Sequence, residues 1–305
     1  MESLNILLLG IVTRKREGTK VAYGRHESFY LRNKWISKGL KHVDNNSTFF
    51  YEKDNFEKIG LGKNMVRSLR FWLTALNLVQ EENKHHTLTP LGKIIFEKDR
   101  LLEKPATIAI LHSELLLNRG DTATVFNWFF TKYKETVTTR AELKSAFKVW
   151  VEAKESKPVS EKSLDRDIDV LIQLYTKEAD ENDPEDSIFS PFTLLHLIKE
   201  ERSGDKSELI RKNEVNYDTT NLTAFYYLLL RYSQNEKVEL IQLDEIMSND
   251  TLWGKVFNIS KSEAIDILNK LATDEKYPLE YVRTSNLDNV KIPQITELEF
   301  LESRL

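Results

Sequence analysis

The stretch KNMVRSLRFWLTAL, residues 63–76, separates into two faces when it is wound as an α-helix. Cationic and polar side chains recur at the spacing of one face, and these are Lys63, Asn64, Arg67, Arg70 and Thr74. The opposite face carries Met65, Leu69, Trp72, Leu73 and Leu76. A helix with an apolar side to bury and a cationic side left free has the character of a DNA recognition helix. The alternative is an amphipathic helix whose basic face is simply solvated.

A hairpin and a second helix are predicted directly after this stretch. Leu78-Val79 is a short apolar strand signal, residues 81–86 form a predicted polar tip that includes His85-His86, and residues 87–89 can return antiparallel. Pro90 then takes its favoured place in the first turn of a helix. Helix, two-stranded wing and helix is the order of a winged helix-turn-helix module. Because the wing follows in the expected place, we favour nucleic-acid contact over a solvated face.

The composition of the 305-residue chain excludes several classes of protein. Its residues are 40% hydrophobic and 30% charged, which excludes disordered and membrane-spanning chains. The absence of cysteine excludes disulfides, iron–sulfur clusters, thiol nucleophiles and cysteine-bound zinc. The apolar stretch from Leu4 to Val12 is too short to span a bilayer and lacks the flanks of a secretory signal. We therefore expect a cytoplasmic protein with no membrane partner.

The formal net charge of −4 conceals an uneven distribution. Residues 1–76 carry 14 Lys and Arg against seven Asp and Glu, a net of +7, and the remaining chain carries 30 against 41, a net of −11. A surface that binds phosphate is therefore expected in the first quarter, where release of counterions would drive affinity. The alternative is that these cations only solubilise the segment.

The whole sequence predicts a mainly α (α+β) fold. We expect multiple winged helix-turn-helix-like units with small β-hairpin wings, joined by helices. Residues 1–100 would form the basic N-terminal region with the winged-helix DNA-binding unit, residues 101–200 a helical segment and a second winged-helix-like unit, and residues 201–305 a C-terminal winged-helix-like unit. This division rests on element order alone, because the units are not sequence repeats.

Local signals define most of the remaining elements. Helices are expected to begin at Pro105 and after Ser160 or Ser163, an aromatic core helix is expected within residues 122–133, and capping boxes are expected at Thr139 and Ser260. Strands are expected at Ile6–Val12, Lys20–Ala22 and Ile188-Phe189, with a hairpin around residues 285–289.

The second unit is not expected to enter a DNA groove. Its predicted recognition helix points Asp165, Asp169 and Gln173 outward, with Asp167 beside the apolar stripe, and these carboxylates would repel phosphates. A divalent metal there is the weaker alternative, because only Asp165 and Asp169 share a face. A solvated or protein-binding face is preferred.

Two other motifs are incomplete. The stretch GLGKN, residues 60–64, lacks the leading Gly and the closing Ser or Thr of a phosphate-binding loop, so no nucleotide cofactor is expected. These glycines are instead expected to let the chain turn tightly into the basic helix. His26-Glu27 lacks the second His of a zinc-protease helix, because Tyr30 stands in its place.

Several motifs resemble one bacterial family. The stretches GRHESFYLR at 24–32, WISKG at 35–39, LGKNMVRSLRFWL at 61–73 and LTPLG at 88–92 carry the resemblance, which continues through Asp99, Leu102-Glu103, Leu111-His112, Trp128-Phe129-Phe130 and SLDRD at 163–167. They resemble the SspB-like family, a domain of unknown function found in DNA phosphorothioation gene clusters. Lys104 and Thr131 depart from the family pattern. The resemblance covers nearly the whole chain in order.

The resemblance implies a part in oxygen-to-sulfur exchange on the DNA backbone within a phage-defence system. It implies double-stranded DNA and sulfur-transfer proteins as partners, and nicking of DNA as the activity. Such cleavage needs carboxylates that hold a cation, Mg or Mn being the candidates, or an activated nucleophile. His26 and Glu27 are the catalytic candidates, and Arg25 and Arg32 are further candidate DNA contacts. A structural ion pair between Glu27 and Arg32, with His26 hydrogen-bonded at a domain junction, is the alternative.

Three functional hypotheses follow. The first is a metal-assisted DNA nickase, in which the identity of the metal is unknown. The second is a non-catalytic DNA-binding adaptor that delivers DNA to sulfur-transfer partners. The third is a transcriptional regulator, which is weaker because nothing in the sequence indicates an effector pocket.

Overall fold

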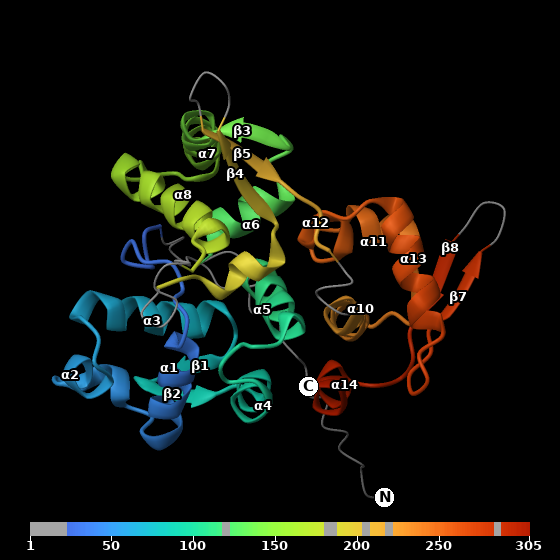
Figure 1. The fold of residues 1–305 in the computed structure, drawn as a ribbon, viewed down its shortest axis with the longest axis horizontal. Helices are drawn as coiled ribbons and strands as arrows, with labels where there is room; N and C mark the ends of the chain where they lie inside the picture. The colour runs from blue at the N-terminus through green and yellow to red at the C-terminus, as the bar shows by residue number, and fades with distance from the viewer. Residues whose placement is uncertain (1–22, 118–122, 180–187, 203–207, 217–221, 284–287) are drawn as a thin grey trace, which may run out of the picture.

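The computed structural model describes residues 23–117, 123–179, 188–202, 208–216, 222–283 and 288–305. The strands expected at Ile6–Val12 and Lys20–Ala22 lie outside the described residues. The fold is a mixture of helices and small antiparallel sheets in which helices predominate (Figure 1), so the α+β prediction is confirmed at this level. Within the described part of the chain, none of the helices combines the length and apolarity needed to cross a membrane.

The first group of elements contains the predicted basic helix. Its members, in chain order, are α1 (Trp35–Asn45), η1 (Phe49–Tyr51), α2 (Asn55–Ile59), α3 (Lys63–Ala75), β1 (Val79–Glu82), β2 (His85–Leu88) and α4 (Pro90–Lys98). Strands β1 and β2 form an antiparallel hairpin that joins α3 to α4 (Figure 1). The predicted order of helix, hairpin and helix is therefore present.

Local chemistry explains these element ends. Gly60 ends α2 with φ of +69°, a left-handed conformation that suits glycine, and α3 begins at Lys63. Asn83 and Lys84 form the two-residue hairpin turn with φ of +50° and +66°, as a type I′ turn requires. The Thr89 hydroxyl caps α4 by accepting a hydrogen bond from the Gly92 amide. Gly60 and Pro90 thus act as the sequence predicts, whereas Gly62 is extended with φ of −65°, a conformation open to any residue.

The second group surrounds a three-stranded sheet. Its members are α5 (Pro105–Leu117), α6 (Thr124–Thr131), β3 (Val137–Thr139), α7 (Arg140–Lys154), α8 (Glu161–Thr176), η2 (Pro191–Leu195), β4 (Ile198–Arg202) and β5 (Glu208–Lys212). The strand order is β3-β5-β4, and both pairings are antiparallel. The capping box predicted at Thr139 is confirmed, and α8 follows Ser160.

The third group repeats this arrangement with another sheet. Its members are α10 (Leu222–Glu236), β6 (Leu240–Gln242), α11 (Leu243–Ser248), α12 (Trp253–Val256), α13 (Lys261–Ala272), β7 (Glu280–Arg283), β8 (Asp288–Lys291) and α14 (Glu297–Arg304). The strand order is β6-β8-β7. The capping box at Ser260 is confirmed, and β7 pairs antiparallel with β8 at the predicted hairpin, of which residues 285–287 lie outside the described part of the chain.

The strand expected at Ile188-Phe189 is absent, because neither residue belongs to a strand among those described. This segment docks instead on the chain before α1. The Tyr30 hydroxyl donates to the Ile188 carbonyl at 3.3 Å, and the Asn33 amide donates to the Phe189 carbonyl at 2.9 Å. The hairpin that follows α8 is made by β4 and β5, further along the chain. The short apolar pair Ile188-Phe189 therefore belongs to a segment that hydrogen-bonds to the chain before α1, and not to a strand.

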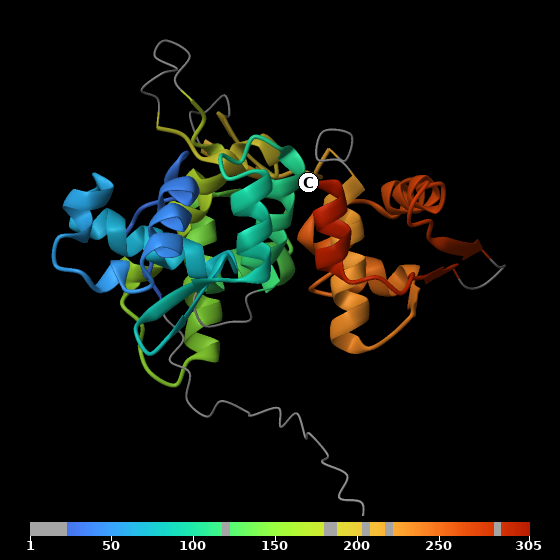
Figure 2. The ribbon, with the colours of Figure 1, turned by 90° about the horizontal axis from the view of Figure 1, so that it is seen from below.

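Helix α5 lies at the centre of the molecule, between the other two groups (Figure 2). Its residues from Ala106 to Leu116 are all buried, because the helix is apolar around its whole circumference. His112 on this helix reaches two other elements. Its Nδ1 lies 2.7 Å from the Tyr175 hydroxyl of α8, and its Nε2 lies 2.7 Å from the Val256 carbonyl of α12.

These contacts fit a neutral imidazole. A carbonyl only accepts, so Nε2 carries a proton, and in the neutral ring Nδ1 then accepts from the Tyr175 hydroxyl. Burial of the ring lowers the pKa of His112 to about 4. Between this pKa and the ordinary value of 6.5, the unfolded chain binds a proton that the folded chain excludes.

We predict that His112 makes the protein less stable as the pH falls below about 6.5 toward 4, by up to about 1.4 kcal/mol per pH unit. Urea unfolding at pH 7.5, 6 and 5 measures this slope. His112→Asn should lack that part of the slope, although the variant is less stable throughout. The control His85→Asn changes an exposed ring and should keep the full slope of stability against pH. Equal slopes in wild type and His112→Asn would show that His112 does not cause the loss of stability.

Candidate nucleic-acid interface

The apolar face of α3 is fixed on two sides. The Trp72 indole N–H donates to the Phe29 carbonyl at 3.1 Å, and the Ser68 hydroxyl donates to the same oxygen at 3.3 Å. The Trp72 ring also packs edge-on against Phe126 of α6, with centroids 5.6 Å apart. Together with buried Leu69, these contacts hold α3 between the segment of residues 23–32 and the second group. They leave the predicted cationic face outward.

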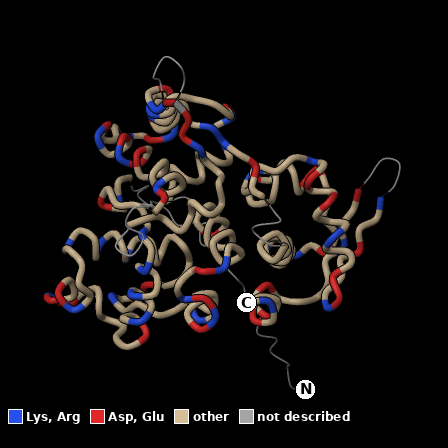
Figure 3. Tube along the Cα trace, in the orientation of Figure 1, with Lys and Arg blue, Asp and Glu red and all other residues tan. Residues whose placement is uncertain are grey.

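Three of the predicted residues occupy that outward face. Lys63, Asn64 and Arg67 are exposed, and 68% of the Arg67 side chain is accessible. The Lys63 ammonium lies 4.7 Å above the Phe56 ring, and Arg67 Nη1 donates to Asn64 Oδ1 at 3.4 Å. Basic and acidic residues are interspersed along the chain (Figure 3), but residues 23–76 hold ten Lys and Arg against five Asp and Glu. This face is therefore the strongest candidate for binding phosphate.

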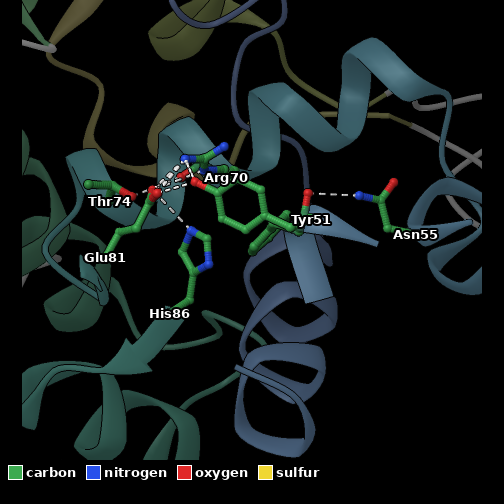
Figure 4. Close-up of polar contacts among 7 residues, drawn as sticks. Tyr51, Asn55, Arg70, Thr74, Glu81 and His86 are labelled. Carbon is green, nitrogen blue, oxygen red and sulfur yellow. Dashed lines mark hydrogen bonds and ion pairs between the residues drawn. The ribbon is translucent and has the colours of Figure 1, made fainter. Parts of the chain in front are cut away.

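Arg70 is held differently, by a carboxylate of the hairpin (Figure 4). Its Nε donates to Glu81 Oε2 at 3.1 Å, and its Nη2 donates to Glu81 Oε1 at 2.7 Å. The guanidinium also stacks 4.6 Å above the Tyr51 ring, and Nη2 donates to the Tyr51 hydroxyl at 2.5 Å. Only 35% of the Arg70 side chain is accessible. The half-buried Thr74 hydroxyl donates to the Arg70 carbonyl.

His86 of β2 also contacts the Glu81 carboxylate that holds Arg70. The sequence places His86 in an exposed tip, and this expectation is wrong, because the turn is only Asn83-Lys84 and His86 packs against Phe50. Its amide donates to the Ser47 carbonyl at 2.7 Å, and its Nε2 lies 3.2 Å from Glu81 Oε2. Burial lowers the pKa of His86. The ring is therefore neutral at neutral pH.

The segment of residues 23–32 contributes one exposed cation and one enclosed cation. Arg25 is exposed. Arg32 is partly buried, with its guanidinium 5.1 Å from the Phe29 ring centroid and 5.4 Å from that of Trp35. The alternative ion pair between Glu27 and Arg32 is not formed. The nearest cation to the Glu27 carboxylate in the described structure is Arg67, at 3.8 Å.

His26 is buried, with 2% of its side chain accessible. The Ser28 amide donates to Nδ1 at 3.1 Å, so the ring proton lies on Nε2, which donates to Asp167 Oδ1 at 2.7 Å. The Gly24 amide donates to the same oxygen at 2.9 Å. Both ring nitrogens are therefore occupied, and the contact ties the segment of residues 23–32 to α8.

The acidic face predicted on α8 is only partly present. Asp167 is buried against His26, and the Asp169 carboxylate is paired with Arg140 at 3.0 Å and Lys144 at 3.2 Å. Asp167 lies three residues after Leu164 and four before Leu171, so it flanks the apolar stripe, and this spacing was the signal for its burial. Of the residues predicted to point outward, Asp165 and Gln173 are half-exposed, and only the expected free charge of Asp169 is corrected.

The described residues contain no group of three His, Asp or Glu side chains that could hold a metal ion. Asp99, which belongs to the matched motifs, has a structural role, because its carboxylate accepts from the Glu103 and Lys104 amides. Glu103 is exposed. No short motif in the sequence indicated that Tyr51, Glu81 and His86 gather around Arg70.

We predict that Asp167→Asn destabilises the protein by about 2–4 kcal/mol, because it weakens a buried hydrogen-bond network that joins two segments. Urea unfolding measures the loss. Asp165→Asn, a change of the same charge on the same helix at a half-exposed position, should cost less than about 0.5 kcal/mol. A loss in Asp167→Asn no larger than in Asp165→Asn would show that the His26 contact is dispensable.

Comparison with known proteins places the chain in a family. No curated protein matches it. The crystal structure of magnesium-ion-bound SspB shares its fold with a TM-score of 0.80, and a second SspB crystal structure does so with a TM-score of 0.77. Each is 21% identical, and the match covers 92% of this chain and 86% of SspB. The family of proteins of unknown function DUF4007 matches residues 23–303, so the chain belongs to the DUF4007 family.

Proposed function

We propose that this protein is the DNA-binding component of a bacterial DNA phosphorothioate-modification and phage-defence system. The observation that carries the proposal is the exposed row of Lys63, Asn64 and Arg67 on a helix whose other face is fixed. Membership of the DUF4007 family and the fold shared with SspB support the choice of system. Double-stranded DNA and sulfur-transfer proteins are the proposed partners.

The proposed mode of binding is that of a winged helix. Helix α3 would enter the major groove, and the β1–β2 hairpin would lie along the neighbouring backbone as the wing. Exposed Arg25 would extend the phosphate contacts beyond α3. The second and third groups also place a strand, helices and a hairpin in winged-helix order, from β3 to β5 and from β6 to β8.

The second and third groups are proposed to bind protein partners rather than DNA. On α8, Asp169 is neutralised by Arg140 and Lys144. On α13, Lys261 pairs with Asp244 at 2.7 Å, and Lys270 pairs with Asp266 at 3.3 Å. These helices therefore present paired charges, which favour a polar protein surface over a phosphate backbone.

We predict that Arg67→Ala weakens binding to duplex DNA and flattens the slope of log affinity against log salt by about one, because one phosphate contact is lost. Fluorescence anisotropy with a labelled duplex at several salt concentrations measures both effects. The matched control is Arg283→Ala, which removes an exposed arginine from β7 and should change neither. Equal effects of the two substitutions would point to a general charge effect.

Nicking of DNA is the second candidate function. The SspB fold match, in which one crystal structure holds a magnesium ion, favours it. Glu27 lies beside the proposed DNA surface, with its side chain 36% accessible and its carboxylate 3.8 Å from Arg67. His26 would then be a positioning residue, because both of its nitrogens are occupied.

We predict that the protein converts supercoiled plasmid to open circles with Mg²⁺ or Mn²⁺, and that Glu27→Gln slows the conversion roughly a hundredfold or more. Glu57→Gln, at an exposed carboxylate of α2, is the control and should leave the rate unchanged. Plasmid that stays supercoiled with both metals, although it is bound, would support the non-catalytic adaptor instead.

A further inference from the structure

Glu81 holds Arg70 in the geometry that a DNA phosphate would use. Arginine binds carboxylate and phosphate through the same fork of parallel N–H donors. In this protein Nε and Nη2 of Arg70 are both directed at the Glu81 carboxylate, with donor–acceptor distances of 3.1, 2.7 and 2.5 Å (Figure 4). The Nε–Nη2 edge of the guanidinium, one of the two edges that can bind a phosphate, is therefore occupied by the hairpin.

The neighbouring side chains keep Glu81 charged and in place. The Tyr51 hydroxyl donates to its carboxylate while the Tyr51 ring supports Arg70. Burial raises the pKa of Glu81, but the hydrogen bonds from Arg70 and Tyr51 outweigh it, so the pKa lies below its ordinary value. His86 beneath is neutral. The pair of Arg70 and Glu81 therefore presents no net charge at neutral pH.

Arg67 shows the contrast on the same helix face. Its distance to the Glu27 carboxylate is 3.8 Å, and most of its side chain is accessible. Such an exposed contact is weak and easily exchanged for a phosphate. Arg70 is half as accessible and is held by a forked pair and a ring. DNA that meets this face gains the Arg67 contact readily, but it must break an internal pair to gain Arg70.

We propose that Glu81 limits the non-specific affinity of this surface for duplex DNA by holding Arg70 in an internal ion pair. The inference rests on the proposed function and names a residue that sets its selectivity. Non-specific binding is a sum of phosphate contacts, so one withheld arginine lowers it for every sequence alike. A duplex site must offer Arg70 a better partner than Glu81 before the contact contributes.

Glu82 supplies a matched control. It follows Glu81 on the same strand, carries the same charge and is exposed. Successive side chains of a strand point to opposite faces, so Glu82 faces away from Arg70. Removing either carboxylate changes the net charge equally. A difference between the two variants therefore reports the release of Arg70.

The test measures how tightly the full chain binds a labelled duplex of random sequence. Fluorescence anisotropy gives the affinity at each concentration of a salt series. Glu81→Gln should bind about fivefold to tenfold more tightly than wild type, the net size of one ordinary hydrogen bond, and its salt slope should be steeper by about one. Glu82→Gln removes an equal charge from the same hairpin, so it should show the effect of that charge alone, a gain of about twofold or less with no steeper salt slope. The double variant Arg70→Ala/Glu81→Gln, which leaves the net charge unchanged, should return to within about twofold of wild type.

The outcomes separate this inference from the proposed function. Wild-type binding that Arg67→Ala weakens, with Glu81→Gln no tighter than Glu82→Gln, would overturn the inference alone. A double variant that loses as much affinity as Arg67→Ala would also overturn it, because Arg70 would then already contribute. Failure of the wild-type protein to bind duplex would overturn both. Urea unfolding of each variant confirms that the compared proteins are folded.

Discussion

The hydrogen bond from the Trp72 indole to the Phe29 carbonyl determines how the rest of the site is arranged. The indole is fully buried, so turning α3 would leave a donor and a carbonyl unpaired, at a cost of about 1–3 kcal/mol for each. Ser68 shares the same acceptor and adds to this constraint. Arg67 therefore points outward because the opposite face of α3 must keep the hydrogen bonds from Trp72 and Ser68 to the Phe29 carbonyl.

Helix α5 transmits this constraint to the rest of the molecule. Its buried Glu114 carboxylate accepts from Asn77, at the turn between α3 and the hairpin, at 2.9 Å. It also accepts from Tyr227 at 2.6 Å and pairs with Arg231, both of α10. A buried carboxylate needs such partners, because an unpaired charge in the interior is costly. Glu114 thus joins the turn after α3 to α10 of the third group through α5.

The sequence predicted the features that depend on neighbouring residues. The two faces of α3, the hairpin after it, Pro90 and the capping boxes all follow from spacings of a few residues. The contacts that define the site do not, because His26 and Asp167 lie 141 residues apart, and the pairing of Arg70 with Glu81 requires the hairpin to fold back on α3. Exposed cations were identified correctly at Lys63 and Arg67, whereas pattern alone could not show that Arg70 and Arg32 are restrained.

The central claim is that the outward face of α3 lies against duplex DNA. The chain has no cysteine, so Asn64→Cys provides a single thiol on that face, and Ser262→Cys provides one on α13 of the third group. Each can carry an iron chelate that cleaves DNA within its reach. Cleavage of bound duplex from position 64 and not from position 262 is the predicted result. Cleavage from position 262 alone would contradict the assignment of the DNA surface to α3.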